Sequence, residues 1–414
     1  MKIAVVGAGI SGMVAAYLLS DEHDITVFEA NDYVGGHTNT VTISTEQGAY
    51  AVDTGFIVFN DWTYPNFTAL LRRLSIATQP STMSFSVKCA QSGLEYNGTS
   101  LNALFAQRRN LLRPSFHRML VDILRFNRTV PRLLQQGDDY TTLGDYLRAH
   151  HYSASFVEHY IIPMGAAIWS ADPQHVWQIP AFFFLQFFHK HGMLRVNRRP
   201  QWCVIKGGSQ QYVRALIHSY RQRIRLRCPV QAVTRTRDSV AVKSPGNEAE
   251  RFDQVVLATH SDQALTLLTD PSEQERIVLG ALPYQRNEIV LHTDTTLLPR
   301  APRAWASWNY HRPLEPQGQV TMTYNMNLLQ SLQAQQTFCV TLNQTAAIDP
   351  RSILRTMTYD HPVYTVRGIA AQKQYASING VNRTYFCGAY WGNGFHEDGV
   401  NSALAVGQCF GKGL

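Results

Sequence analysis

The chain has 414 residues, of which 45% are hydrophobic and 16% are charged. This length and composition predict a globular protein with a sizeable core, organised as two interleaved domains. The formal net charge of +7 favours an anionic membrane surface or an acidic ligand as partner. Because the sequence has no nucleic-acid-binding module, we expect no nucleic acid partner.

The six cysteines are scattered and no two have C-x-x-C spacing, so we expect reduced thiols in a cytoplasmic protein. The first predicted strand begins at Lys2, which leaves no room for a signal peptide. No apolar run is long enough to span a bilayer. We therefore predict a cytoplasmic location, free or peripheral at the inner membrane face, and no metal site.

The first 29 residues have the pattern of a dinucleotide-binding unit. A buried strand is predicted over Ile3–Val6, an apolar helix ends near Leu19, and a second strand over Ile25–Phe28 ends at Glu29. Three glycines between the first strand and the helix form G-x-G-x-x-G: Gly7, Gly9 and Gly12. The alternative is a plain βαβ turn without a ligand, but the full context favours dinucleotide binding.

Each part of this unit has a physical task. Gly7 makes the tight turn, Gly9 lets the backbone approach a pyrophosphate, and Gly12 lets the helix pack on the strand. The helix N-terminus offers free N–H groups and a partial positive charge to the phosphates. Glu29 accepts hydrogen bonds from ribose hydroxyls and repels a 2′-phosphate, which disfavours NADP.

The next elements continue towards residue 100. Gly35-Gly36 permits a second close backbone approach, and a strand ending near Asp53 leads to Gly55, where a flat ring can approach the backbone. A helix is predicted over Asp61–Leu74, and alternating strands over Ser84–Asn97.

Two segments of the middle region stand out. Arginines alternate with leucines, isoleucine and phenylalanines over Arg108–Arg132, which is either a solvated helix face or a surface that touches anionic lipid. Tyr160–Phe188 is the most aromatic segment, and three prolines break it into short pieces. This aromatic segment either lines a large apolar pocket or forms ordinary core.

The second half alternates strands with glycine turns. Over Trp202–Leu216 we predict a strand, the Gly207-Gly208 turn and a helix, followed by a strand pair over Arg223–Arg235. A strand over Asp253–Thr259 leads to a helix over Ser261–Leu268. Further strands are predicted over Leu282–His292, Arg303–Tyr310 and Gln319–Tyr324, and a loop or surface helix over Gln330–Gln336. A last strand ends at Gly388, and a glycine-rich loop leads through Gly399 to a helix with Asn401 and Ser402 in its first turn.

In this order, the opening motif, Gly35-Gly36, Asp53-Thr54-Gly55, Gly207-Gly208, Val255–Thr259 and the Gly388–Gly399 loop resemble the superfamily of flavin-dependent amine oxidases, protoporphyrinogen oxidases and phytoene desaturases. The resemblance implies an α/β fold with a Rossmann-type FAD-binding domain and an interleaved mixed-sheet and helical substrate domain. It assigns residues 1–80, 200–270 and 380–414 to the FAD-binding domain. The substrate domain, with the basic helical region, takes residues 81–199 and 271–379.

The resemblance also implies FAD as the cofactor, with Glu29 on the adenosine ribose and the final loop over the flavin ring. The FAD-binding residues that it implies are Gly7, Gly9, Ser11, Gly12, Glu29, Gly35, Gly36, His37, Thr38, Thr54, Gly55, Phe56, Val230, Thr259, Gly388, Asp398, Gly399 and Val400. The candidates for proton handling are His396, Glu397 and Asp398. Alternatively these three shape the loop and hold the flavin, and Asp398 caps the last helix.

A closer likeness lies in DTGFIVFNDWTYPNFTALL, STMSFSV, LFAQRRNLLRPSF and YWGNGFHEDG. These stretches resemble the flavoprotein module at the N-terminus of plant cyclopropane fatty acid synthases and its stand-alone bacterial relatives. The likeness implies a lipid or other apolar substrate, oxidised or desaturated by hydride transfer to FAD, and a synthase-like methyltransferase as partner.

Two other functions stay open: an amine oxidase that releases peroxide, and a non-catalytic, FAD-stabilised partner of such a synthase. The amine oxidase is disfavoured because many of these enzymes place a lysine near flavin N5, and Leu282–Val290 contains none. A clear aromatic cage is also missing from the final loop, although Tyr390, Trp391 and Phe395 are available for one.

Overall fold

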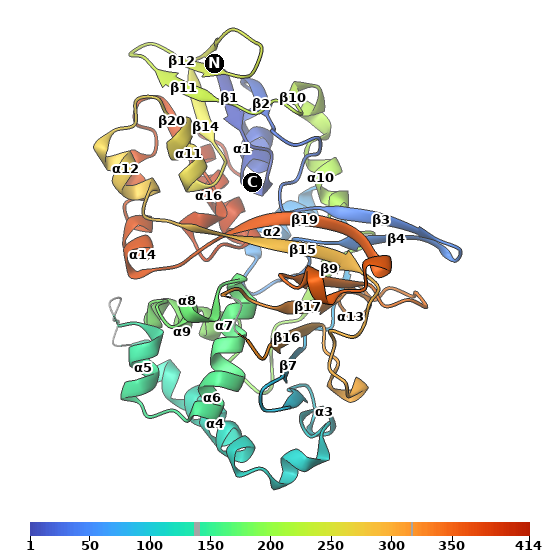
Figure 1. The fold of residues 1–414 in the computed structure, drawn as a ribbon. Helices are drawn as coiled ribbons and strands as arrows, with labels where there is room; N and C mark the ends of the chain where they lie inside the picture. The colour runs from blue at the N-terminus through green and yellow to red at the C-terminus, as the bar shows by residue number, and fades with distance from the viewer. Residues whose placement is uncertain (136–140, 316–317) are drawn as a thin grey trace.

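The computed structural model describes residues 1–135, 141–315 and 318–414, and its chain forms two lobes (Figure 1). The upper one, here called the parallel-sheet lobe, is built on a five-stranded parallel sheet with the order β10-β2-β1-β14-β20. The strands are β1 (Lys2–Val6), β2 (Asp24–Phe28), β10 (Ile224–Arg225), β14 (Gln254–Leu257) and β20 (Thr384–Phe386). This is the predicted Rossmann-type arrangement, so the α/β fold class is confirmed.

The strands of this sheet are apolar on both sides because both faces are covered. On one face α1 (Ile10–Leu19) packs along α16 (His396–Cys409), beside α10 (Gln210–Leu216). The other face packs against an antiparallel meander and two further helices. These elements are β11 (Ala232–Arg235), β12 (Val240–Lys243), β13 (Glu250–Phe252), α11 (Ser261–Leu267) and α12 (Glu273–Leu279).

The second lobe, the mixed-sheet lobe, contains a seven-stranded sheet with the order β19-β15-β18-β17-β16-β7-β8. Its strands are β7 (Phe85–Cys89), β8 (Glu95–Asn97), β15 (Tyr284–His292), β16 (Trp308–Arg312), β17 (Met322–Asn325), β18 (Cys339–Leu342) and β19 (Ile353–Pro362). The long strands β15 and β19 pair antiparallel and run along the boundary between the lobes (Figure 1). Therefore residues at one end of these two strands face the parallel-sheet lobe.

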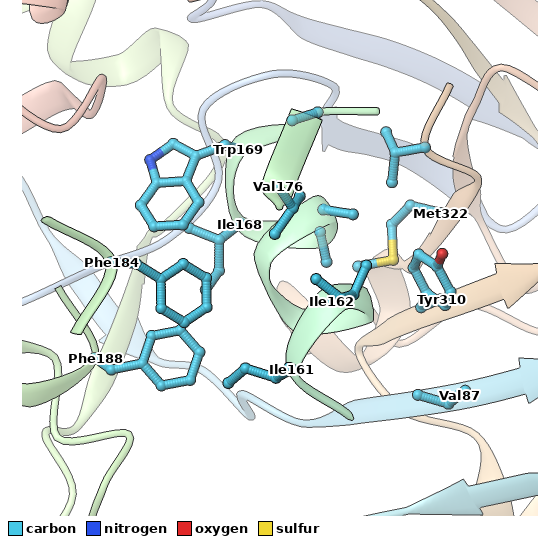
Figure 2. Packing of buried hydrophobic residues seen from close by; sticks show 14 of the residues in the cluster. Val87, Ile161, Ile162, Ile168, Trp169, Val176, Phe184, Phe188, Tyr310 and Met322 are labelled. Carbon is cyan, nitrogen blue, oxygen red and sulfur yellow. The ribbon is translucent and has the colours of Figure 1, made fainter. Parts of the chain in front are cut away.

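Helices form the lower part of the mixed-sheet lobe. They are α3 (Leu101–Leu104), the 3-10 helix η1 (Arg108–Leu112), α4 (Pro114–Leu133), α5 (Leu143–Ala149), α6 (Ala154–Phe156), the π-helical turn η2 (Val157–Ile161), α7 (Ile162–Trp169), α8 (Pro173–Val176) and α9 (Ala181–Lys190). The aromatic segment predicted over residues 160–188 thus folds into short helices. Figure 2 shows Trp169, Phe184 and Phe188 from this segment packed in the core.

Smaller elements connect the lobes. The strands β5 (Phe59–Asn60), β6 (Thr78–Pro80) and β9 (Trp202–Ile205) form a three-stranded sheet, and β3 (Thr40–Thr45) pairs with β4 (Gly48–Asp53) as a hairpin. The remaining helices are α2 (Pro65–Arg73), α13 (Met326–Leu329), α14 (Val366–Gln372) and α15 (Tyr375–Ile378), together with the short helices η3 (His218–Arg223), η4 (Pro302–Ala304), η5 (Thr345–Ala347), η6 (Pro350–Ser352) and η7 (Ala389–Trp391).

The strand pair predicted over residues 223–235 is wrong. β10 joins the parallel sheet beside β2, whereas β11 joins the meander, and the loop between them contains Pro229. The helix predicted from residue 61 begins at Pro65, where Pro occupies the first turn. The predicted strand over residues 303–310 starts as η4, and β16 covers only its end.

The division into two domains stays a prediction. The origin of the strands in each of the two large sheets agrees with the predicted segments. All five strands of the parallel sheet come from residues 1–80, 200–270 and 380–414, and all seven of the mixed sheet come from the other two segments. Among the helices that the structure describes, none combines the length and the apolar character needed to cross a membrane.

Candidate functional site

Two glycine loops meet at the carboxyl end of β1. A Cβ placed on Gly36 would lie 3.1 Å from the Cα of Gly9, and the Gly35 N–H donates to the Ala8 carbonyl oxygen at 2.9 Å. A Cβ on Gly12 would collide with the Gly7 carbonyl oxygen, which is why the helix packs so closely on the turn. Beyond Gly9, by contrast, a Cβ would meet no atom within 4 Å. The loops therefore enclose open space next to the N-terminus of α1.

Glu29 lies at the far side of the same turn, with 6% of its surface exposed. Its carboxylate accepts hydrogen bonds from the Ala8 N–H at 2.8 Å and from the Asn31 N–H at 2.9 Å. The loop before β11 is fastened beside it, since the Cys228 N–H donates to the Glu29 carbonyl oxygen at 2.8 Å. This brings the segment of Val230, one of the FAD-binding residues that the resemblance implies, to the same end of the site as Glu29.

The loop after Gly36 packs directly on the Asp53-Thr54-Gly55 turn. The Phe56 N–H donates to the His37 carbonyl oxygen at 2.9 Å, and a Cβ on Gly55 would collide with that oxygen. Thr54 Oγ1 donates to the Asn39 carbonyl oxygen at 2.8 Å. Asp53 is fully buried and accepts from the Ser209 N–H at 2.9 Å, which fixes the Gly207-Gly208 turn to this wall.

The C-terminal loop closes the site from the other side. A Cβ on Gly399 would lie 3.0 Å from Ser11 Oγ, so the N-terminal turns of α16 and α1 touch. The Gly388 N–H donates to Ser402 Oγ at 2.9 Å, and Val400 is fully buried. The helix starts at His396, three residues before the predicted glycine, so Asn401 and Ser402 lie in its second turn.

The three candidates for proton handling have structural partners. The Glu397 carboxylate accepts from the Asn66 N–H at 3.0 Å and the Phe67 N–H at 2.8 Å, at the start of α2. Asp398 accepts from the Phe395 N–H at 2.9 Å, which caps its own helix as one of our alternatives expected. His396 stacks on Phe56 with ring centroids 3.5 Å apart.

The His396 Nε2 lies 2.9 Å from Thr38 Oγ1 and 3.1 Å from the Tyr212 hydroxyl. Burial holds the pKa of His396 well below its ordinary value, and the nearby His37 adds to this effect. Burial also raises the pKa of Asp398 to about 6. The geometry thus favours a role in shaping the loop for these side chains, and their part in proton transfer stays a prediction.

Two histidines that the sequence did not single out, His260 and His361, lie beside the predicted residue His37 where the lobes meet. The His37 ring is 5.3 Å from the His361 ring of β19 and 6.2 Å from the His260 ring, which follows β14. His260 in turn stacks on Tyr284 of β15 at 4.4 Å. Burial lowers the pKa of His37 to about 4 and that of His361 to about 3, so both are neutral at pH 7.

Several buried polar atoms of this region have no hydrogen-bond partner among the described residues. They are His37 Nε2, the hydroxyls of Tyr364 and Tyr390, and Trp391 Nε1. Buried polar groups are rarely left without a partner in folded proteins, because their desolvation is then uncompensated. His37 Nε2 lies on the loop that follows Gly36, so it is available to a polar ligand at the glycine loops.

The sequence profile of the flavin containing amine oxidoreductases matches residues 10–299, which is more than half of the chain. The chain belongs to this family. A protein of Mycobacterium tuberculosis named as a flavin-containing monoamine oxidase, AofH, is 27% identical over 258 residues, or 60% of this chain and 55% of that protein. The chain thus aligns with about half the length of this curated relative.

Solved structures of low sequence identity share the whole fold. Cyclohexylamine oxidase from Brevibacterium oxydans has a TM-score of 0.68 at 15% sequence identity, with 99% of both chains covered. The CLA-producing fatty acid isomerase from P. acnes has a TM-score of 0.69 at 13% identity, covering 99% of this chain and 98% of that one. The predicted superfamily and two-domain flavoprotein fold are therefore confirmed.

The site of this family member fits FAD. The open space at Gly9 lies at a helix N-terminus, as a pyrophosphate requires, and Glu29 has a buried carboxylate for ribose hydroxyls. When bound, FAD supplies the hydride-accepting chemistry, while the chain binds it, orients it and excludes water.

The sequence offered a weak signal for some of the missed residues. His260 directly follows the predicted strand that ends at Thr259, where a Rossmann sheet places ligand contacts. Tyr359, whose ring lies 4.9 Å from that of His37, and His361 are two residues apart on β19, and the polar composition of this strand gave no strand signal. Tyr390 and Trp391 pack on each other at 4.9 Å, whereas Phe395 stacks on Phe187 instead, so the three do not form a cage.

Proposed function

We propose that this flavin-dependent oxidoreductase oxidises or desaturates a fatty acyl chain of a lipid, by hydride transfer from carbon to FAD. The carrying observation is an aromatic wall that stands next to buried, neutral histidines. The histidines there are neutral at pH 7, and the neighbouring wall is aromatic. Such surroundings suit an apolar chain and disfavour an ammonium group, because a buried charge needs a partner.

The aromatic wall stands directly beside the final loop. Phe187 of α9 stacks on Phe395 with centroids 5.2 Å apart, and Phe183 stacks on Tyr364 at 4.8 Å. Trp169 contacts Phe187 at 5.0 Å, and its Nε1–H donates to the Asn393 carbonyl oxygen at 3.1 Å. These contacts support a binding surface for methylene groups next to the flavin.

The strand β15 supports the same proposal. The segment from Leu282 to Val290 contains no lysine, and its single cation, Arg286, is 77% exposed and pairs with Asp360. No cationic side chain of this strand therefore reaches the buried junction. One structural neighbour is a fatty acid isomerase, so another protein with this fold acts on a fatty acid.

An amine oxidase activity is the second candidate, favoured by the name of the Mycobacterium tuberculosis relative and by the cyclohexylamine oxidase fold. A third possibility is that FAD only stabilises the chain as a partner of a cyclopropane-fatty-acid-synthase-like methyltransferase. These candidates differ in what reduces the flavin. Under anaerobic conditions, an acyl lipid should bleach the FAD absorbance if the first proposal holds, and an amine should do so if the protein is an amine oxidase. Neither should bleach it if FAD only stabilises the chain.

The test uses FAD-loaded protein without oxygen. Phospholipids with saturated and monounsaturated acyl chains, cyclohexylamine and putrescine are added in turn, and the flavin spectrum is recorded. We expect bleaching by an acyl lipid, with a matching unsaturated or oxidised product in the mass spectrum. Bleaching by the amines alone would replace the proposal with an amine oxidase, and an unchanged spectrum throughout would favour the non-catalytic partner.

A further inference from the structure

One surface of the mixed-sheet lobe combines leucines with arginines. It is formed by α3, η1 and the outer side of α4, at the lower end of the molecule in Figure 1, and is called here the basic–apolar face. Residues 101–133 contain seven arginines and one aspartate, so this segment contributes +6 to a protein of net charge +7. Most of the excess positive charge is therefore concentrated on one face.

The same face exposes large apolar side chains. The exposed fractions are 88% for Leu112, 77% for Leu101, 56% for Val121, and 50% for both Leu111 and Leu124. The opposite side of α4 packs Phe116, Met119, Phe126 and Val130 into the core. The exposed leucines and valine are therefore not needed to attach this helix to the rest of the chain. Clustered apolar groups left in water mark an interaction surface more often than a solvated one.

The charges of this face point outward and are largely unpaired. Asp122, the only acid of the segment, is fully buried and pairs with Arg118 at 3.5 Å and Arg125 at 3.1 Å. Arg128 and Arg132 are exposed and have no ion-pair partner among the residues that the structure describes. A partner of this face must therefore be anionic and must also bury leucines.

We propose that the basic–apolar face docks on an anionic lipid bilayer. Leucines of η1 and α4 enter the boundary between headgroups and acyl chains, while the arginines contact lipid phosphates. Inserted leucines alone, or arginines alone, would bind a membrane only weakly and reversibly. The basic–apolar face combines both. The proposal does not depend on the acyl substrate, although it brings the lobe with the aromatic wall to the membrane.

A small cavity adds donors for a lipid phosphate. It has a volume of about 100 Å³ and lies at the start of α4, and its lining residues include Arg113, His159, Ser92, Ser115 and Ser155. Arg113 donates one N–H to the Ser92 carbonyl oxygen at 3.0 Å, and a guanidinium keeps further donors for a phosphate. The cavity is adjacent to the exposed end of η1, where a headgroup would follow inserted leucines.

The test measures co-sedimentation of the FAD-loaded full chain with vesicles of phosphatidylcholine alone or mixed with phosphatidylglycerol. We expect binding to the anionic vesicles that weakens with salt, because exposed charges are screened. Arg128→Gln with Arg132→Gln should reduce binding about twentyfold to thirtyfold, since each basic residue near the surface contributes about fivefold. Leu111→Ser with Leu112→Ser should reduce binding as well.

Matched controls lie in the parallel-sheet lobe, at the opposite end of the molecule. Arg237→Gln with Arg251→Gln changes the net charge equally, and Leu226→Ser is the apolar control; both should bind like the unchanged protein. Equal binding to neutral vesicles, equal loss in the control pair, or no vesicle binding at low salt would overturn the proposal. So would a dimer by light scattering that the leucine variant abolishes, because a second copy would then cover the face.

Discussion

Gly399 of α16 lies against Ser11 of α1, and this contact joins the two ends of the chain at one site. A Cβ on Gly399 would stand 3.0 Å from Ser11 Oγ and 2.7 Å from Ile10 Cγ2. Both helices therefore point their N-termini at the same region, and their N–H groups add to one positive potential. This contact depends on the absence of a side chain at position 399.

We predict that Gly399→Ala lowers the melting temperature and weakens FAD binding. Inside a helix, Gly→Ala normally stabilises by roughly 0.5–1 kcal/mol, so the expected sign is the reverse of the usual one. The new methyl would force α16 away from α1 and widen the site. Thermal unfolding and FAD titration check this, and a higher melting temperature with unchanged affinity would contradict it.

Gly9→Leu should leave the fold intact but abolish FAD binding. The space beyond Gly9 is open, and its backbone is extended, so a side chain fits there without a clash. The leucine would occupy the volume that we assign to the pyrophosphate. Gly98→Leu, also in open space but distant from the site, is the control. Circular dichroism and bound flavin per chain report the two effects, and a yellow Gly9→Leu protein would disprove the assignment.

Glu397→Ala should destabilise the protein by about 1–2 kcal/mol, because two N–H groups at the start of α2 lose a charged acceptor. Glu248→Ala, on an exposed loop, should change the free energy of unfolding little. Urea unfolding followed by fluorescence measures both. If Glu397→Ala leaves stability unchanged but prevents flavin reduction by substrate, the carboxylate handles protons after all.

The free energy of unfolding should fall as the pH drops from about 6.5 to about 4. His292 is buried, and its Nε2 lies 2.7 Å from Thr341 Oγ1. Burial lowers the pKa of this histidine to about 4. Between these pH values the unfolded chain therefore binds a proton at His292 that the folded chain does not bind. The free energy of unfolding consequently decreases on acidification. Buried His37 and His361 act in the same direction, whereas the raised pKa of Asp53, about 6, acts in the opposite one.

His292→Gln isolates one of these contributions. The variant should be less stable at pH 7, but its pH dependence should be shallower by about 1.4 kcal/mol per pH unit between pH 6.5 and pH 4. Chemical unfolding at several pH values gives the two slopes. Parallel slopes would mean that folding does not lower the pKa of His292.

The sequence by itself determined the flavoprotein framework. A G-x-G-x-x-G turn, an acid at the end of the next strand and a glycine-rich loop before the last helix are local signals, because each fixes the backbone of a few neighbouring residues. For the same reason the aromatic segment and the basic amphipathic helix were visible as composition and periodicity.

Only the tertiary structure decided which side chains share the site. His37, His260 and His361 come from three distant segments, and His361 reaches the others because β19 pairs with β15 in one register. Glu397, a predicted candidate for proton handling, also accepts hydrogen bonds from two N–H groups of the helix that begins at Pro65. Contacts of this kind depend on strand register and on helix packing between the lobes, and no local pattern of residues encodes either.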